Sequence, residues 1–552
     1  MGVETEYAIR CRQNATISGA VLDFDRLTTS LGYETPIAPS FRNPYRLFLA
    51  NGGCISLETG ATPSLKHAML ESATPECHSP RELLCYQLAM EKLLSEVVSS
   101  TFVEQDAHLL KGSADAHGHT YGQHESYEMR IAQGPHLLGW RLGLLLMLPA
   151  VMAYRVLAAV WFLVIWLLSQ TFAILFQSAR LIRRRTSQFD IPTSSSAKPK
   201  SSQRSQMHPG WVWLCASGLR VLHLPIALLL WCNIVCFALR SQRKHLSSFL
   251  ASRCIIDGAG YLDKENRFWV SARASTINCG IGFGSYGRSS PLFRCDSWLR
   301  GLCVGPFWTL GNYFSLFSDR QRVELAIGDS GMCEQSQYVR LGATALVLDL
   351  VEKMTPKVPQ LNNPVDAIRR FARDWMLLAS VADRSGRQWT SMDIQHAYAA
   401  AVRQMLQTKS NVPIEAWKIL DQWQSTLNQL QPTDDEANLP RTMLGRIDWL
   451  SKLWLLHQTN AGATWQARKK IDLRYHELSS SGYHRRLNET LELAPILDPF
   501  DVSRARRTPP VGSPATQRGY LIREFSASEC NLHVDWTRAE FIFEGKKRRI
   551  LF

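Results

Sequence analysis

The segment Gly2-Val3-Glu4-Thr5-Glu6-Tyr7 places two glutamates two residues apart, in a stretch whose alternation predicts a β-strand from Glu4 to Ile9. Side chains alternate between the two faces of a strand, so Glu4 and Glu6 should point to the same face. Two carboxylates on one face suit an oxygen-ligated divalent metal such as magnesium. The segment therefore predicts one part of a metal site.

Two further acidic segments strengthen this interpretation. They are Leu70-Glu71-Ser72-Ala73-Thr74-Pro75-Glu76-Cys77 and Tyr121-Gly122-Gln123-His124-Glu125-Ser126-Tyr127. Glu71 and Glu76 bracket a short turn, and Glu125 adds an acid beside His124, which can carry a proton. One glutamate pair on a strand usually faces solvent, whereas several pairs near glycine-rich turns favour a shared metal site. Glu125 is accordingly a fifth candidate ligand.

Composition limits the class of protein. The chain has 552 residues, 45% hydrophobic and 20% charged, enough for two or three domains or for one large catalytic domain with additions. The net charge of +14 is spread along the chain without an aromatic-interleaved basic patch, so nucleic-acid binding is not expected. The 13 cysteines form no CxxC pair, which argues against a zinc knuckle or a secreted disulfide framework and favours a reducing cytosol.

Two long apolar stretches interrupt the mixed pattern. Residues 156–176 hold no Asp, Glu, Lys or Arg over 21 positions, and residues 221–239 hold none over 19. Each is close to the ~20 residues that cross a bilayer core. Trp161, Trp166 and Trp231, together with basic flanks, are typical of membrane helices. We expect two membrane helices that contact lipid; the alternative is a pair of buried helices in a globular domain.

The segment between these stretches complicates the topology. Gln177 to Gly210 is rich in Ser, Lys and Arg, which predicts a flexible linker. A two-span hairpin with a cytoplasmic catalytic domain would place the seven Lys and Arg residues of 177–208 outside, against five in the nearby flanks. The positive-inside rule disfavours that arrangement, so a re-entrant or interfacial helix pair stays open. In either case we expect a membrane-associated protein whose catalytic domain faces the cytoplasm.

The pattern along the chain predicts four parts. These are an N-terminal part of a catalytic domain (1–133), an insertion with membrane helices at about 142–176 and 211–239 (134–244), the rest of the catalytic domain, helical in its second half (245–495), and a small C-terminal domain (496–552). Pro80 to Val98 has helical spacing, and Phe268 to Ser275 is expected to be a strand. Gly280 to Gly284 lacks the Lys-Ser/Thr of a phosphate-binding loop and is expected to be a flexible turn.

Short motifs spread over nearly the whole chain resemble one protein family. They are Gly2 to Tyr7, Asn51-Gly52-Gly53, Ser72 to Cys77, Tyr121 to Tyr127, Val270-Ser271-Ala272-Arg273, Gly328-Asp329-Ser330, Leu341 to Leu348, Asp393-Ile394-Gln395, Ile447-Asp448-Trp449, Ile471 to His476 and Val534-Asp535-Trp536. Each motif is weak alone, but together and in this order they are similar to the family of Pup ligase and the depupylase/deamidase Dop, relatives of glutamine synthetase.

The resemblance implies an α+β fold in which a curved, glutamine-synthetase-like antiparallel sheet forms a cradle for ATP, with helices, a smaller C-terminal domain and, here, the inserted hydrophobic helix pair. It implies an ATP- and Mg²⁺-dependent ligase that phosphorylates the terminal glutamate side chain of a Pup-like protein and joins it to a lysine of an acceptor protein. A Pup-like partner would end in Glu or Gln. A depupylase/deamidase and a catalytically impaired, membrane-tethered scaffold that still binds nucleotide are the alternatives.

The resemblance also assigns roles to individual residues. It matches Glu4 and Glu71 to metal ligands, with Glu6 and Glu76 as their companions at the metal site. Thr74 and Trp536 match nucleotide contacts, with the indole of Trp536 stacking on adenine, and Arg273 would face phosphate. Metal and arginine together would neutralise charge on a transferred phosphoryl group.

The chain departs from the family pattern close to the expected catalytic base. The family has an aspartate where this chain has Glu58, and the extra methylene moves the carboxylate enough to cost ~100-fold if nothing compensates. An arginine is replaced by Cys54, a tyrosine by Ser56 and a histidine by Glu324. These departures keep the scaffold alternative open, although all four metal-site glutamates are present.

Overall fold

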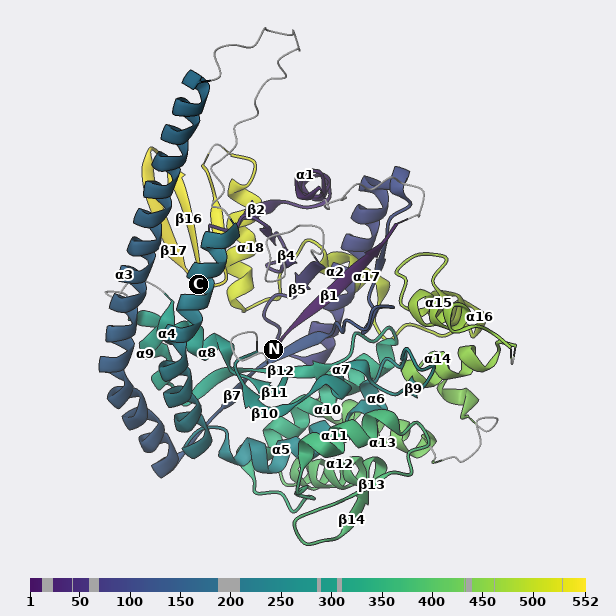
Figure 1. The fold of residues 1–552 in the computed structure, drawn as a ribbon. Coiled ribbons are helices and arrows are strands. Elements are labelled where there is room, and N and C mark those ends of the chain that lie inside the picture. The colour runs from purple at the N-terminus through teal and green to yellow at the C-terminus, as the bar shows by residue number, and fades with distance from the viewer. Residues whose placement is uncertain are drawn as a thin grey trace.

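A ten-stranded sheet forms the centre of the computed structural model (Figure 1). The structure describes all residues except 12–22, 42, 59–68, 187–208, 285–288, 305–309, 431, 433–438, 461 and 529. The strand order is β10 (Cys279–Gly282), β11 (Pro291–Arg294), β12 (Arg320–Gly328), β7 (Gln123–Arg130), β1 (Gly2–Arg10), β5 (Met69–Ala73), β4 (Cys54–Glu58), β3 (Arg46–Leu49) and β2 (Ile37–Pro39), with β6 (His108–Leu110) beside β1. Neighbouring strands are antiparallel except for the parallel pair β10–β11.

The predicted strand at the start of the chain lies in the middle of this sheet. Val3, Thr5 and Tyr7 of β1 are buried, whereas Glu4 and Glu6 alternate with them on the other face. The apolar set fixes the register, because a slip by one residue would turn these side chains out of the core and the glutamates into it. The expectation that Glu4 and Glu6 share a face is confirmed.

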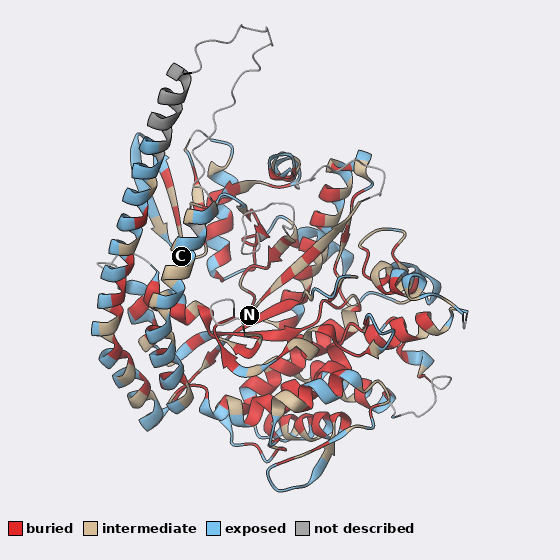
Figure 2. Cartoon of the chain, in the orientation of Figure 1, coloured by how far each residue is buried: buried red, intermediate tan, exposed pale blue. Residues whose placement is uncertain are grey.

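Helices cover the face of the sheet that carries Tyr7. The long helices α2 (Pro80–Thr101) and α10 (Glu334–Lys353) pack on this face, and α5 (Arg240–Ser252) packs against α10. Ser79 caps α2 by accepting a hydrogen bond from Glu82 N, and a proline at the first helical position suits this start. Figure 2 shows the buried residues concentrated in these helices and in the sheet.

The second half of the chain adds mainly helices. α12 (Ser391–Gln407) and α13 (Ile414–Gln429) pack against α10, and α11 (Pro364–Arg373) packs against α5. Further helices are α1 (Phe24–Glu34), α6 (Cys254–Asp257), α14 (Asp448–His457), α15 (Trp465–Tyr475), α16 (Tyr483–Thr490) and α17 (Pro499–Ala505), and a hairpin is formed by β13 (Ser380–Ala382) and β14 (Gln388–Thr390). A small C-terminal unit consists of α18 (Pro514–Phe525), β15 (His533–Asp535), β16 (Arg538–Phe543) and β17 (Lys546–Leu551), and it packs against β2 and β3.

Two local expectations are corrected. The expected strand from Phe268 to Ser275 is only a two-residue strand, β9 (Phe268–Trp269), paired with β8 (Tyr261–Leu262). It is followed by the short helix α7 (Ala272–Thr276), which begins where the Ser271 side chain accepts a hydrogen bond from Ala274 N. The expected turn at Gly280 to Gly284 instead contributes β10, because pairing with β11 at the sheet edge orders it.

The hydrophobic insertion is a hairpin of two helices that run side by side along one flank of the molecule (Figure 1). They are α3 (Gly134–Thr186) and α4 (Pro209–Cys236); most of the predicted basic linker lies outside the described residues. Leu239 N donates a hydrogen bond to Ile131 O at 2.9 Å, so the two ends of the insertion meet beside the end of β7. The catalytic domain resumes with α5, a few residues earlier than expected.

Candidate active site

One face of the sheet carries a row of polar side chains that crosses four strands. In the strand register Arg46 is opposite Ser56, Ser56 is opposite Glu71, and Glu71 is opposite Glu6. Directly opposed residues of antiparallel strands point to the same face, so these four side chains lie together. Ser56 Oγ donates a hydrogen bond to Glu71 Oε2 at 3.0 Å. The register therefore brings Glu6 and Glu71 together, as the acidic motifs predicted.

A second row lies beside the first and contains Cys54, Glu4 and His124. Arg322, which projects from β12, donates from Nη2 to Glu4 Oε1 at 2.8 Å and from Nε to Ser126 Oγ at 2.9 Å. Its side chain is 51% exposed, so this ion pair faces the open side of the sheet. Glu4, Glu6 and Glu71 thus form one acidic group with an arginine at its rim.

His124 ties two of the acids together. Its Nδ1 lies 3.1 Å from Glu324 Oε1, and its Nε2 lies 3.7 Å from Glu6 Oε1. Burial alone would lower the pKa of His124, but the two carboxylates raise it well above its usual range. Burial would raise the pKa of Glu324 and that of Glu6, yet the close contact with His124 and its positive charge hold both below their usual values. The site therefore holds a buried imidazolium between two carboxylates at neutral pH.

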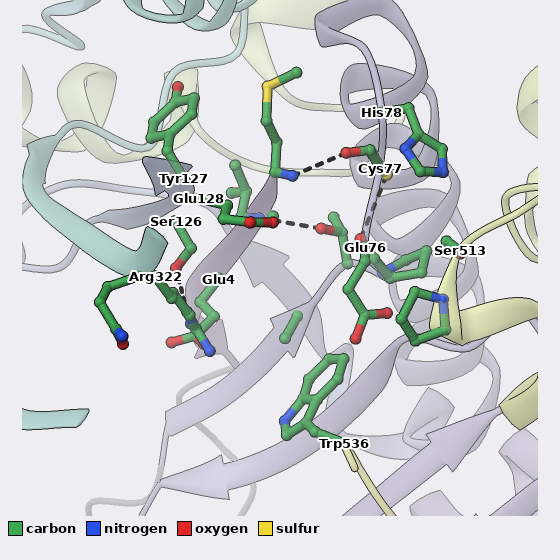
Figure 3. A pocket seen from close by; sticks show the side chains of 18 of the residues that line it. Glu4, Glu76, Cys77, His78, Ser126, Tyr127, Glu128, Arg322, Ser513 and Trp536 are labelled. Atoms are coloured by element: carbon green, nitrogen blue, oxygen red, sulfur yellow. Dashed lines mark hydrogen bonds and ion pairs between the residues drawn. The ribbon is translucent and has the colours of Figure 1, made fainter. Parts of the chain in front are cut away.

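A pocket of about 540 Å³ opens next to this acidic group (Figure 3). Glu4 and Arg322 line one side, and Glu76 and Trp536 line the other. Thr74 lies at the wall, where its Oγ1 accepts a hydrogen bond from Val3 N at 3.0 Å. Glu4, Thr74 and Trp536, which lie far apart in the sequence, are thus brought into one pocket.

Glu76 is committed to a different cation from the other acids. Its carboxylate pairs with the buried Arg518 at 2.5 Å, and Arg518 also donates to Gly52 O at 2.8 Å. The guanidinium carbon of Arg518 lies 4.8 Å from the ring centroid of Trp536. Glu76 therefore shares the pocket with Glu4, but in this arrangement it holds Arg518 and, through it, the indole.

The structure does not bring Glu125 to the acidic face, which corrects its assignment as a candidate metal ligand. Neighbouring residues on a strand point to opposite faces, so Glu125 points into the helix-covered core while His124 faces the site. Glu125 is fully buried and accepts hydrogen bonds from Arg253 at 2.8 and 2.9 Å and from Tyr127 at 2.9 Å. It is a structural ion-pair partner.

Arg273 lies close to Glu6 and does not line the pocket. Its Nε donates to Ala326 O at 2.9 Å, and its backbone N donates to Asp329 Oδ1 at 2.9 Å. Burial lowers the pKa of Arg273, and the nearby charge of Glu6 opposes this. Glu6 is held in turn by Gly122 N, which donates to its Oε2 at 3.0 Å. Arg273 thus supports Glu6 electrostatically.

Glu58, the expected catalytic base, is the last residue of β4. Its Cα is paired with that of Met69, and it lies two residues beyond Ser56 on the strand. The orientation of its side chain lies outside the described part of the structure. Two further site residues, Arg46 and Arg322, had no assigned role in the sequence. In the sequence, only the alternation Arg322-Val323-Glu324 indicates that the side chains of Arg322 and Glu324 share a face.

The donor set fits magnesium. Three carboxylates on neighbouring strands supply the hard oxygen ligands that this ion prefers. Arg46 lies in the same row and adds a cation beside these carboxylates. The residues therefore suit a metal–phosphate ligand.

Comparisons with known proteins agree over almost the whole chain. The family model described as Pup-ligase protein matches residues 1–540. The Pup–protein ligase of Acidimicrobium ferrooxidans is 25% identical and covers 100% of this chain and 94% of its own length. The Pup deamidase/depupylase of Mycobacterium tuberculosis is 27% identical but covers only 51% of this chain and 54% of its own length.

Solved structures show the same fold. The crystal structure of the complex between Pup and its ligase PafA matches 100% of this chain and 88% of that chain with a TM-score of 0.65 at 17% identity. PafA in complex with ADP matches 92% and 86% with a TM-score of 0.60 at 17% identity. The predicted α+β fold and the family resemblance are confirmed. The chain therefore belongs to the Pup-ligase family.

Proposed function

We propose that this protein is an ATP-dependent ligase that activates the side-chain carboxylate of a terminal glutamate, on a Pup-like protein or peptide, and joins it to a lysine. The observation that carries the proposal is the pocket in which Trp536 and Thr74 lie beside Glu4, on the same face of the sheet as Glu6 and Glu71. This arrangement suits a nucleotide whose base packs on the indole and whose phosphates point toward the acidic group.

In this proposal the three glutamates would hold Mg²⁺, which would neutralise charge on the phosphates. Arg46 and Arg322 flank the acids and would contact phosphate oxygens through charge-assisted hydrogen bonds. The glutamate carboxylate of the substrate accepts the terminal phosphoryl group of ATP, and the lysine amine then displaces phosphate. The amine loses a proton in this step, and Glu58 is the candidate acceptor.

The choice between ligation and the reverse reaction rests on how much of the chain each relative matches. The ligase from Acidimicrobium ferrooxidans matches the full chain, whereas the Mycobacterium depupylase matches about half of it. Ligation is therefore the first candidate. Depupylation or deamidation is the second candidate, because it would use the same pocket and acidic group.

The test is ATP hydrolysis by the detergent-solubilised protein with Mg²⁺, with and without a Pup-like peptide that ends in glutamate. We expect peptide-stimulated turnover, and a reduction of about 100-fold in Glu58→Ala, because a positioned base typically contributes 10²–10⁴-fold. Nucleotide binding without turnover, unchanged in Glu58→Ala, would contradict the ligase proposal and leave a nucleotide-binding scaffold.

Arg46→Ala is expected to weaken ATP binding about 10- to 100-fold, since a charge-assisted hydrogen bond contributes about 1.5–3 kcal/mol. Adenosine binding should not change, because it has no phosphate for the guanidinium to contact. Arg370→Ala, which removes an exposed arginine of α11, is the matched control. Calorimetric titration with ATP and adenosine measures both affinities. Equal losses for the two ligands would show that Arg46 supports the fold and not the phosphates.

We also propose that the protein is membrane-associated, with the catalytic domain facing the cytoplasm. By length and composition, two helices could cross a membrane, Gly134–Phe172 and Trp213–Cys236. Such helices also occur as buried helices of soluble proteins. Here, however, only 22% of the apolar 18-residue stretch of the first helix and 28% of that of the second are buried. The large exposed apolar surface supports the proposal.

A further inference from the structure

Glu76 lines the pocket but lies apart from the acidic group. It follows the end of β5 in the chain, whereas the three glutamates of the acidic group lie on the paired strands β1 and β5. The side chain of Glu76 is 39% exposed, and Figure 3 shows it directed toward the indole of Trp536. Glu76 is therefore placed with the indole and not with the other three carboxylates.

Arg518 fixes the orientation of the Glu76 carboxylate. Its Nη1 donates to Oε1 at 3.3 Å, and its Nη2 donates to Oε2 at 2.5 Å. Gly52 O accepts from Nε and Nη2 at 3.0 and 2.8 Å, and Trp536 O accepts from Nη1 at 3.0 Å. These five hydrogen bonds use all the N–H groups of a guanidinium. Arg518 thus has no donor left for a ligand and serves to hold the carboxylate.

This pairing disfavours a metal ion at Glu76 but leaves acceptor capacity. A divalent cation bound there would lie close to the guanidinium of Arg518, and like charges at such a distance repel. A carboxylate offers about four acceptor sites, of which Arg518 takes one on each oxygen. The other sites can accept a hydrogen bond from a ligand in the pocket.

The same guanidinium positions the indole. Its central carbon lies 4.8 Å from the ring centroid of Trp536, and the buried Phe48 meets the indole edge-on at 5.2 Å between centroids. One buried arginine thus sets the position of Glu76 relative to Trp536. A base that packs on the indole brings its nucleoside within reach of the Glu76 carboxylate.

Charge decides which part of a nucleotide can lie at Glu76. Phosphate oxygens are negative and only accept hydrogen bonds, so they are repelled by a carboxylate. Arg46 and Arg322, which flank the acidic group, are the cations suited to the phosphates. The nucleoside, in contrast, carries uncharged donors, namely the 2′ and 3′ hydroxyls of ribose and the 6-amino group of adenine. The nucleoside therefore matches Glu76.

We propose that Glu76 determines nucleotide specificity by accepting a hydrogen bond from the nucleoside of bound ATP, from a ribose hydroxyl or from the adenine amino group. This rests on the proposed nucleotide site and names the group that the protein recognises there. An acidic side chain that accepts from ribose is a common feature of nucleotide sites. Arg518 is the positioning residue that holds Glu76 for this contact.

The test is calorimetric titration of the full-length protein and of Glu76→Gln with four nucleotides. They are ATP, 2′-deoxy-ATP, 3′-deoxy-ATP and purine riboside triphosphate, which lacks the 6-amino group. We expect the wild-type protein to bind at least one analogue about tenfold more weakly than ATP, because a hydrogen bond to a charged group is lost. Glu76→Gln should bind ATP about tenfold more weakly and should no longer distinguish that analogue from ATP. The analogue affected identifies the donor.

Glu128→Gln is the matched control. Glu128 lines the same pocket but pairs with Arg320 at 3.3 Å, on the exposed side of the sheet. This substitution removes a charge from the pocket wall and should leave the preference for ATP over each analogue unchanged. Binding of Mn²⁺, followed by electron paramagnetic resonance, should be retained in Glu76→Gln, since the acidic group is intact.

Three results would overturn the proposal. Equal affinity of the wild-type protein for all four nucleotides would show that no nucleoside donor is recognised, and this result does not depend on the fold of any variant. An equal loss for all four in Glu76→Gln would show that Glu76 only supports the indole, and a loss of Mn²⁺ binding would make it a metal ligand. ATP binding without turnover would contradict the ligase proposal alone, whereas a wild-type protein that binds no ATP would contradict both.

Discussion

Replacing Glu71 by glutamine should lower ATP turnover at least about a thousandfold while leaving the protein folded. Glu71 lies between Glu6 on β1 and Ser56 on β4, so the substitution removes one charge from the centre of the acidic group. Metal-assisted neutralisation of phosphate charge is worth several kcal/mol, and each 1.36 kcal/mol is tenfold in rate. Steady-state ATP hydrolysis at saturating peptide, measured over a range of Mg²⁺ concentrations, checks the expectation.

Ser56→Ala is the matched control for this substitution. It removes a hydrogen bond to the same carboxylate but keeps its charge, so a loss of only about tenfold is expected. If Glu71→Gln retained more than a tenth of the wild-type turnover, the acidic group would not be the metal site. Binding of Mn²⁺, followed by electron paramagnetic resonance, gives a readout that does not depend on catalysis.

Arg253→Met should destabilise the catalytic domain by about 3–5 kcal/mol, the typical cost of removing one partner from a buried ion pair. Arg253 is 1% exposed and binds Glu125 at 2.8 Å and Asp257 at 3.0 Å. The variant would leave both carboxylates buried without this cation. Urea-induced unfolding of the solubilised protein measures the loss, and Arg370→Met, at an exposed pair on α11, should cost less than about 1 kcal/mol.

The loss in Arg253→Met should also depend on pH. Burial raises the pKa of Asp257 to about 7 even with Arg253 beside it. A raised folded-state pKa gives stability that is complete below the unfolded pKa, near 3.9, and that is lost as the pH rises through 7. The variant should therefore lose more stability at pH 8 than at pH 6. A loss equal to that of Arg370→Met at both pH values would contradict the assigned role of the buried pair.

The strand at the start of the chain could be predicted because its signal is local. Alternation over six residues sets which side chains share a face, so the pairing of Glu4 with Glu6 follows without tertiary information. Glu6 and Glu71 are opposite each other because of the strand register. The sequence motifs predicted only that the two residues lie close together. Arg46 lies in the same row only because three successive strand pairs, β3–β4, β4–β5 and β5–β1, have the observed registers. No pattern in the sequence near Arg46 indicates this position.

Glu125 shows why the rest of the site could not be assigned from sequence. His124 and Glu125 are adjacent and point to opposite faces, and a glutamate is the residue that one would place on the solvated face. Its burial depends on Arg253, which lies 128 residues away in the sequence. The sequence contains both residues but no indication that they meet.

The hydrophobic insertion was predicted correctly as a helix pair, but its docking onto the catalytic domain was not. A membrane helix is predicted from the length of an uncharged apolar run, and this length does not show that the run packs on α8 (Asp296–Cys303). The partners of Arg155 are backbone carbonyls, which have no sequence signature. Only the fold shows which residues of the insertion pack on the catalytic domain.

The hydrogen bond between Leu239 N and Ile131 O holds the two ends of the insertion together, so the insertion can be exchanged as one unit. A gene rearrangement at this single point can add, remove or replace the helix hairpin without shifting any strand of the sheet. Trp140 packs against Trp298, with ring centroids 5.6 Å apart. The part of the hairpin that carries Trp140 must therefore be kept when the rest is removed. A shortened derivative should therefore join α3 to α4 just beyond Arg155, so that the indole of Trp298 stays covered while the outer part of the hairpin is removed.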